Sequence, residues 1–197
     1  MNKPFSEACL QNRTPILEVI QPLLKTCQTV LEIGSGTGQH AVYFTEELTH
    51  INWQTSDRSE HHQGIKAWLQ DANNPKIQAP LALDVLQDDY PQQQFDAIFS
   101  ANTLHIMSKP AVASFFKVVE ACIQPQGVVM VYGPFNYGGQ YTSDSNAQFD
   151  GWLKSRDENS GIKDFEWINQ LATAVGLQLQ NDHAMPANNR ILQWQKT

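Results

Sequence analysis

The stretch TVLEIGSGTGQHAVYF occupies residues 29–44, and it decides which fold the chain can adopt. Residues 29–33 are mostly β-branched or apolar, which predicts a buried strand. Gly34, Gly36 and Gly38 then allow a sharp turn in which a ligand can lie against bare backbone. Residues 39–49 follow with a helical pattern. A strand, a glycine turn and a helix in this order are typical of α/β folds that bind nucleotide-like ligands.

The same alternation of strands and helices continues on both sides of this stretch. Thr14 and Ser59 are candidate helix caps, and Pro80 favours an edge position for its strand. Two final strands, joined by MPANN at 185–189, must pair antiparallel because the connection is too short for a helical crossover. We therefore expect an α/β, Rossmann-like fold with a mainly parallel seven-stranded sheet, the last strand antiparallel and helices on both faces. The predicted strands are 51–56, 77–83, 95–102, 128–133, 177–184 and 190–195, and the predicted helices are 14–25, 59–72, 109–122 and 163–175.

Composition and charge narrow the class of protein. Of the 197 residues, 41% are hydrophobic, enough for one domain over 1–197 with its own core. The formal net charge of −7 argues against binding to nucleic acid or anionic lipid. No apolar run reaches the roughly 18 residues of a membrane-spanning helix, and residues 1–13 lack the apolar core of a secretory signal. We expect a cytoplasmic protein whose three widely spaced cysteines stay reduced.

The glycine turn is compatible with several ligands, and its neighbours narrow the choice. No lysine follows Gly38, which argues against a phosphate-binding P-loop, and Gln39 stands where a dinucleotide fold prefers glycine. The remaining pattern, E-x-G-x-G-x-G starting at Glu32, resembles the first motif of class I S-adenosylmethionine methyltransferases. That resemblance implies S-adenosylmethionine as the cofactor, with its carboxylate on backbone amides and its positive groups near Glu32. An NAD-linked oxidoreductase is the alternative that Gln39 disfavours.

Polar residues at the ends of the next strands complete the expected cofactor site. Asp57 ends the second strand, where a carboxylate can bind both ribose hydroxyls, or can instead cap the helix that follows. In the methyltransferase pattern Asp84 meets the adenine amino group and Val85 lies beside the ring, although a strand-end turn residue is the plainer alternative for Asp84. Residues 100–105 should run under the methionine arm. The expected cofactor-binding set is Glu32, Gly34, Ser35, Gly36, Gly38, Asp57, Arg58, Asp84, Val85, Asn102 and Leu104.

The substrate side is expected to come from two peripheral segments. Residues 135–162 are rich in aromatic residues and glycine, and we expect them to form a substrate-side lid with a helix around 149–152. The N-terminal helical segment 1–28 should reach the same opening. His105 is the candidate base, because its pKa lies near neutrality, and Tyr141 is a second catalytic candidate; a satisfied structural histidine is the alternative for His105. The expected substrate-binding set is Asn12, Arg13, Tyr141, Ser143, Asn146 and Arg156.

Several further features bear on the chemistry of the substrate. Two arginines in the predicted substrate set would suit an anionic group, or would simply tie the lid to the body. Neither H-x-x-x-H nor H-E-x-x-H occurs, so we expect no metal. The segment 100–105 lacks the N-P-P-[YF] element with which DNA amino-methyltransferases hold a flipped base, which favours a small-molecule substrate.

Four segments together carry a closer resemblance. They are FSEACLQNRTPIL at 5–17, LEIGSGTGQHAVYF at 31–44, YGPFNYGGQYTSDSNAQFDGWLKSRDENSGIKD at 132–164 and MPANNRILQWQK at 185–196. These segments resemble the family of methyltransferase-like protein twenty-six, over nearly the whole chain. The resemblance implies a small cofactor-binding methyltransferase, and it leaves the methyl acceptor and the oligomeric state open. A non-catalytic S-adenosylmethionine-binding protein with a regulatory or scaffold role is the alternative function.

Overall fold

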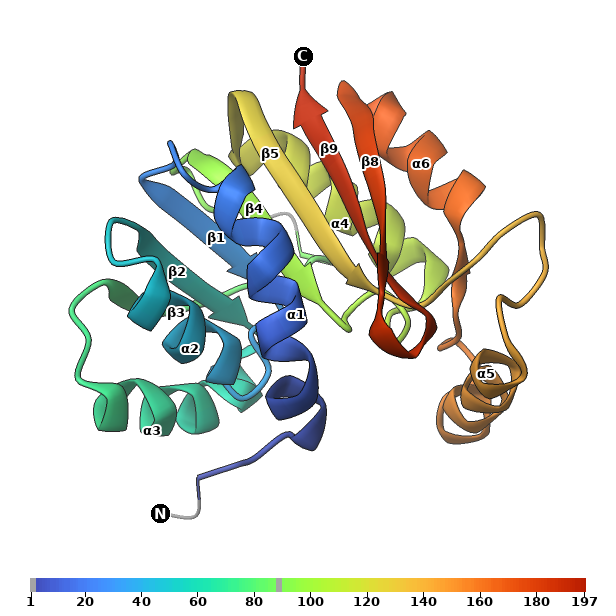
Figure 1. The fold of residues 1–197 in the computed structure, drawn as a ribbon, viewed down its shortest axis with the longest axis horizontal. Helices are drawn as coiled ribbons and strands as arrows, with labels where there is room; N and C mark the ends of the chain where they lie inside the picture. The colour runs from blue at the N-terminus through green and yellow to red at the C-terminus, as the bar shows by residue number, and fades with distance from the viewer. Residues whose placement is uncertain (1–2, 88–89) are drawn as a thin grey trace.

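The computed structural model describes residues 3–87 and 90–197 and builds them around a seven-stranded sheet (Figure 1). The strand order is β3-β2-β1-β4-β5-β9-β8. Strands β1 to β5 run parallel, and β9 is antiparallel to both of its neighbours, β5 and β8. The fold class predicted from the sequence is thereby confirmed. The strands are β1 Thr29–Ile33, β2 Asn52–Asp57, β3 Ile77–Ala82, β4 Phe95–Ala101, β5 Ile123–Gly133, β8 Leu177–Met185 and β9 Asn189–Lys196.

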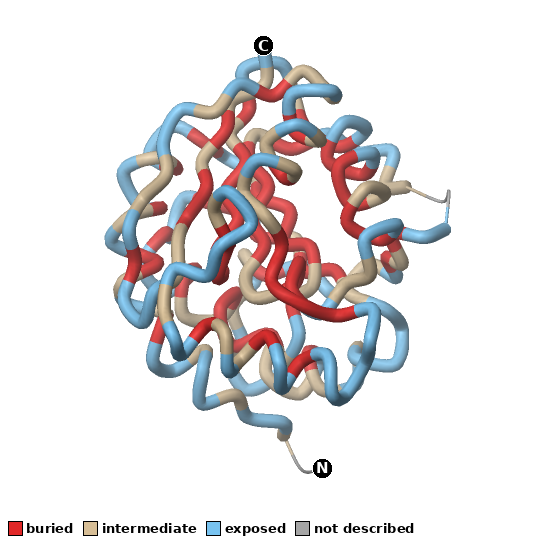
Figure 2. The backbone as a smooth tube through the Cα atoms, turned by 90° about the vertical axis from the view of Figure 1, so that its right-hand side faces the viewer, coloured by how far each residue is buried: buried red, intermediate tan, exposed pale blue. Residues whose placement is uncertain are grey.

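Helices cover both faces of the sheet and bury it in two cores. In Figure 1, α1, α2 and α3 lie in front of the sheet, and α4 and α6 lie behind it. The central strands serve both cores, because alternate residues point to opposite faces: Val30 packs into one core and Leu31 into the other. Figure 2 shows this buried backbone running through the middle of the molecule. The helices are α1 Glu7–Leu23, α2 Gln39–Glu47, α3 His62–Ala72, α4 Lys109–Cys122, α5 Asp144–Arg156 and α6 Phe165–Ala174.

The first helix starts earlier than the sequence pattern predicts. Helix α1 begins at Glu7, and its cap is Ser6, whose hydroxyl accepts a hydrogen bond from the Cys9 amide at 3.3 Å. Thr14 therefore caps nothing, and Pro15 lies inside the helix. Proline removes one backbone donor from the helix interior. The helix continues through it because residues such as Ile16 are fully buried against the sheet, and this packing outweighs the lost bond.

Two other predicted boundaries are also corrected. Ser59 opens a short 3₁₀ turn over Ser59–His61 and no side chain caps it, so α3 starts only at His62. Strand β5 begins at Ile123, because Ile123 pairs with Phe95 before the register shifts at Ala97. The edge position predicted from Pro80 is confirmed, since β3 ends the sheet. None of the helices in the described ranges combines the length and hydrophobicity that a bilayer crossing requires.

The segment after β5 has more regular structure than the sequence predicts. Its ends are tied together, because β6 at Phe135–Asn136 pairs in parallel with β7 at Lys163–Asp164. Between them lies α5, which is capped by the Ser143 hydroxyl on the Asn146 amide at 3.1 Å. Figure 1 shows α5 beyond the end of the sheet toward which the β4 and β5 arrows point. The segment therefore places a full helix beside the carboxyl ends of the central strands.

Candidate functional site

The three glycines of the turn after β1 meet three different surroundings. All three have positive φ, at +77° for Gly34, +59° for Gly36 and +87° for Gly38. A Cβ on Gly34 would lie 2.8 Å from the Thr103 side chain, and one on Gly38 would lie 3.3 Å from a methyl of Ile65 in α3. A Cβ on Gly36 would meet nothing within 4 Å. Gly36 is therefore the glycine of this turn that leaves room for a ligand.

A buried carboxyl group holds the turn from behind. The Glu32 side chain, in a residue only 1% exposed, accepts hydrogen bonds from Ser35 Oγ at 2.8 Å and from Trp53 Nε1 at 3.1 Å. The Ser35 hydroxyl in turn accepts from the Ser56 amide at 3.1 Å. Burial raises the pKa of Glu32 to about 7, with the two hydrogen bonds opposing this shift and the charge of Asp57 adding to it. Glu32 thus supports the turn instead of facing a ligand.

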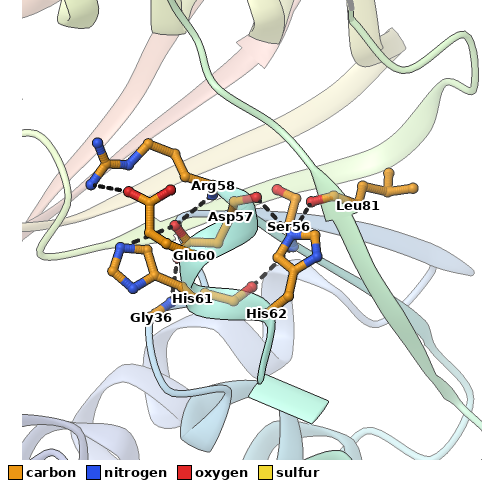
Figure 3. A network of polar contacts seen from close by, with 9 residues as sticks. Gly36, Ser56, Asp57, Arg58, Glu60, His61, His62 and Leu81 are labelled. Carbon is orange, nitrogen blue, oxygen red and sulfur yellow. Dashed lines mark hydrogen bonds and ion pairs between the residues drawn. The ribbon is translucent and has the colours of Figure 1, made fainter. Parts of the chain in front are cut away.

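Asp57 links the end of β2 to the glycine turn, as Figure 3 shows. One carboxylate oxygen accepts from the Gly36 amide at 2.7 Å, and the other accepts from the Arg58 amide at 2.8 Å. His61 approaches the same carboxylate at 4.0 Å, and His62 contacts the Asp57 carbonyl at 2.9 Å. The alternative role of Asp57 as a helix cap is wrong, because neither the 3₁₀ turn nor α3 has a side-chain cap. Asp57 sets the shape of the turn.

A cavity of about 1290 Å³ lies over the glycine turn and the ends of β2, β3 and β4. Most of the expected cofactor set lines it: Gly34, Ser35, Gly36, Asp57, Arg58, Asp84, Val85 and Asn102. Three expected residues do not line it. Glu32 lies behind the turn, Gly38 packs against α3, and Leu104 is 4% exposed in the core. The cavity is also lined by residues outside the expected cofactor-binding set: Thr37, His40, Leu83, Thr103 and Ile106.

His40 is the most informative of the missed residues. It is 5% exposed, and its Nε2 lies 2.7 Å from Asn12 Oδ1, while its Nδ1 lies 3.9 Å from Cys9 Sγ. Burial, together with the charge of Arg13, lowers the pKa of His40 to about 4, so its ring is neutral at pH 7. The sequence feature that could have pointed to His40 is its position just after the glycine turn. Its partners Asn12 and Cys9 lie on α1, more than twenty-five residues away, so the local sequence pattern does not reveal them.

Gln39, which argues against a dinucleotide, has a clear structural role. Its side-chain oxygen accepts from the Ser6 amide at 2.6 Å, and its side-chain nitrogen donates to the Ser6 carbonyl at 3.4 Å. This amide pairing holds the start of α1 against α2. Pro4, Ser6 and Cys9 are thereby brought into the lining of the first cavity. Gln39 therefore holds the N-terminal segment in a position where it forms part of the cavity wall.

A second cavity, of about 1010 Å³, adjoins the first, and both are lined by Ala8, Arg58, Asn102, Ile106 and Asp157. Asn12, Asn146 and Arg156 of the expected substrate set line it, and so does His105. Its walls come from α1, the end of β5, α5 and the turn at Pro186–Asn188. The two cavities together give room for two ligands in contact with each other.

His105 is buried, and its pKa is lower than the near-neutral value expected from the sequence. The residue is 8% exposed, and its ring lies edge-on to Phe149 with 5.2 Å between ring centres. Burial, together with the charge of Lys163, lowers the pKa of His105 to about 4. Neither ring nitrogen has a hydrogen-bond partner among the described residues. A neutral imidazole with a free nitrogen therefore faces the second cavity.

Three predicted substrate residues lie outside both cavities. The Tyr141 hydroxyl donates to the buried Asp150 carboxylate at 2.7 Å, so it is occupied within the protein. The Arg13 guanidinium lies 4.3 Å from the centre of the Tyr43 ring, and Ser143 caps α5. Tyr141 is therefore not placed to touch a substrate in this structure. Within the described ranges no group of three or more His, Cys, Asp or Glu side chains could hold a metal ion.

This sheet order, with a cavity over a glycine turn, is the class I methyltransferase fold, and solved methyltransferases share it. An O-methyltransferase family protein from Burkholderia thailandensis matches with a TM-score of 0.85 at 12% identity, covering 97% of this chain and 58% of that one. Human N-acetylserotonin methyltransferase, solved with SAM, matches at 0.79 and 15%, covering 96% and 53%. A Planctomyces limnophilus O-methyltransferase family 2 protein, solved with apigenin, matches at 0.80 and 16%, covering 94% and 56%. The chain thus spans little more than half the length of these proteins.

The sequence itself places the chain in a family. It belongs to the family described as "Protein of unknown function (DUF938)", whose model matches residues 3–196.

Proposed function

We propose that this protein is an S-adenosylmethionine-dependent methyltransferase that acts on a small molecule, as its resemblance to methyltransferase-like protein twenty-six implies. The observation that carries the proposal is the pair of adjoining cavities at the carboxyl ends of the strands. One contains the glycine turn, Asp57 and Asp84, and the other contains a neutral, unpartnered His105. The solved methyltransferases that share this fold support the same function.

The first cavity has the groups that the cofactor requires. The turn at Gly36 leaves open space beside bare backbone, and Asp57 keeps lone pairs free for ribose hydroxyls beyond its two amide contacts. Asp84 and Val85 follow β3, and one Asp84 oxygen accepts from the Leu86 amide at 3.0 Å, as in a strand-end turn. An adenine at this place would find an acceptor in the carboxylate and an apolar neighbour in Val85. When bound, S-adenosylmethionine supplies a methyl group that its sulfonium already activates. The protein must therefore mainly align the acceptor and exclude water.

The second cavity is suited to hold that acceptor. His105 can take the proton from a hydroxyl or similar group as the methyl is transferred, because its ring is neutral at pH 7 and one nitrogen is free. Asn12 and Asn146 add neutral hydrogen-bonding groups. Arg156 lies over the Trp152 ring at 4.8 Å and has no carboxylate partner among the described residues. An anionic group on the substrate would find its partner there. Helix α5 with its flanking loops, within 135–162, then acts as the wall or lid of this cavity.

Calorimetry with S-adenosylmethionine, its demethylated product and NAD tests the proposal. We expect both adenosyl compounds to bind with micromolar affinity, about −8 kcal/mol, and NAD to bind more weakly. Tighter binding of NAD would overturn the assignment of the cofactor. Labelled methyl groups should also pass from S-adenosylmethionine into a metabolite extract. Binding without any transfer would instead favour the non-catalytic alternative.

Gly36→Ala should weaken cofactor binding without unfolding the protein. The added Cβ enters the open space of the first cavity, and we expect the Kd to rise about tenfold or more. Gly138→Ala is the matched control, because Gly138 has φ +57° and an equally open Cβ position but lines neither cavity. The left-handed conformation should cost both variants about 1–2 kcal/mol of stability. Equal cofactor affinity in the two variants would contradict the placement of the ligand.

Asp57→Ala should lower both affinity and stability. Loss of the ribose contacts should weaken binding by about 1.5–3 kcal/mol, the range for hydrogen bonds to a charged group. Loss of the acceptor for the Gly36 amide should add about 1 kcal/mol of destabilisation, measured by urea unfolding. Asp71→Ala, which removes an exposed ion pair with Lys3, is the control and should leave affinity unchanged. If Asp57→Ala loses stability but keeps the cofactor affinity of the wild type, Asp57 shapes the turn and does not bind the ribose.

A further inference from the structure

Three consecutive carbonyl groups of the loop that carries His105 are held by one short segment. The His105 carbonyl accepts from the Gly161 amide at 2.8 Å. The Ile106 carbonyl accepts from the Ser160 hydroxyl at 3.2 Å, and the Met107 carbonyl accepts from Lys163 Nζ at 2.8 Å. Residues 160–163 thus bind every carbonyl in 105–107, just where the two cavities meet.

Lys163 is an unusual member of this segment, because it is buried without a salt bridge. The residue is 5% exposed, and its ammonium donates to the carbonyls of Met107 and Gly161, the latter at 2.7 Å. No carboxylate among the described residues lies within ion-pair distance of it. Burial lowers its pKa to about 8. The charged groups that influence its pKa are Asp150 and Lys154 of α5, Asp157 after it, and Lys109 of α4.

The segment 160–163 is itself fixed to α5 through Asp150. One oxygen of this carboxylate accepts from the Ile162 amide at 2.7 Å, and the other accepts from Tyr141 at 2.7 Å and Lys154 at 2.6 Å. The contact is so close that a Cβ on Gly161 would lie 2.9 Å from Asp150 Oδ1. Helix α5 therefore touches the His105 loop twice, directly through Phe149 and indirectly through Asp150 and residues 160–163.

We propose that Lys163 is a positioning residue for His105: with Ser160 and Gly161 it holds the loop 105–107 so that the imidazole faces the substrate cavity. Its positive charge at neutral pH opposes protonation of the imidazole, so it also helps to keep the His105 ring neutral. Tyr141 acts one step further away, by holding Asp150. The inference rests on the proposed role of His105, and it gives a buried lysine without a counter-ion a function.

The test is the titration of His105 by NMR together with hydrogen exchange at the Gly161 amide, both on the full chain without ligands. Lys163→Met removes the charge and the donors, so His105 should titrate closer to its ordinary value and the Gly161 amide should exchange about tenfold faster or more. Lys163→Gln keeps donors but removes the charge. It should raise the pKa of His105 while the amide stays protected. Lys117→Met removes an exposed charge of α4 and should change neither measurement.

The outcomes distinguish a Lys163 that positions His105 from a Lys163 that only stabilises the loop. If Lys163→Met exchanges faster at Gly161 but His105 titrates as in the wild type, the lysine is only structural and the proposal is overturned. Unchanged titration and exchange would overturn it as well. If Lys163→Met does not fold, Lys163→Gln gives the answer: a pKa of His105 equal to that of the wild type would overturn the proposal. These measurements need no cofactor, so they stand apart from a failure to bind S-adenosylmethionine. In a methyl-transfer assay, the proposal requires a lower kcat with an unchanged KM for the cofactor.

Discussion

Methyl transfer should fall by about 10²–10⁴-fold when His105 is replaced by glutamine, the range expected for loss of a general base. Glutamine fills a similar space and can donate and accept hydrogen bonds, but it cannot take up the acceptor's proton. Because His105 lines the second cavity and not the first, cofactor affinity should stay unchanged. The measurement is the transfer of labelled methyl from S-adenosylmethionine into a metabolite fraction, with calorimetry of the demethylated product alongside.

His183→Gln is the matched control for this variant. His183 lies on β8 beside Gln193 at 3.0 Å and lines neither cavity, so its replacement should leave the rate within about twofold. A His105→Gln protein with the wild-type rate would show that the acceptor arrives already deprotonated. The mechanism would then consist of alignment alone.

Glu32 should make the stability of the protein fall as pH rises. The pKa of its carboxyl is about 7 in the folded protein, against an ordinary value of 4.5, so folding favours the protonated form. The stabilisation that comes from the protonated Glu32 carboxyl is fully present below its pKa in the unfolded chain, and it is lost as pH rises through 7. At about 1.4 kcal/mol per unit, the wild type should lose about 2–3 kcal/mol relative to Glu32→Gln between about pH 5 and pH 8. Urea unfolding of both proteins at the two pH values measures the difference.

The comparison with Glu32→Gln isolates this one group, because His40 and His105 titrate in both proteins. Glu46→Gln, an exposed change on α2, should follow the wild type at every pH. Parallel curves for Glu32→Gln and the wild type would mean that water or movement of the turn relieves the buried carboxylate. The role of Glu32 beneath the turn would then need revision.

Much of the lining of the first cavity could be predicted from the sequence. The run from Thr29 to Phe44 identifies strand, turn and helix by local pattern alone. Asp57 and Asp84 could be placed beside it because the carboxyl ends of neighbouring parallel strands meet at one edge of the sheet. Pro80 located the edge strand for a similar reason, since proline cannot donate to an inner neighbour. The positions of these residues are predictable because each depends on local residue chemistry and on a general rule of sheet topology.

The sequence alone therefore predicts the fold, the glycine turn and the acidic residues at the strand ends. Other features become visible only in the folded chain: Tyr141 donates to Asp150, Gln39 binds the N-terminal segment, and His40 lines the first cavity. Each of these depends on side-chain contacts, and those of Gln39 and His40 join residues that lie far apart along the chain. Periodicity reports which face of an element is buried, but it does not report which partner the fold brings to that face. The contacts that shape both cavities depend on such partners, which periodicity does not report.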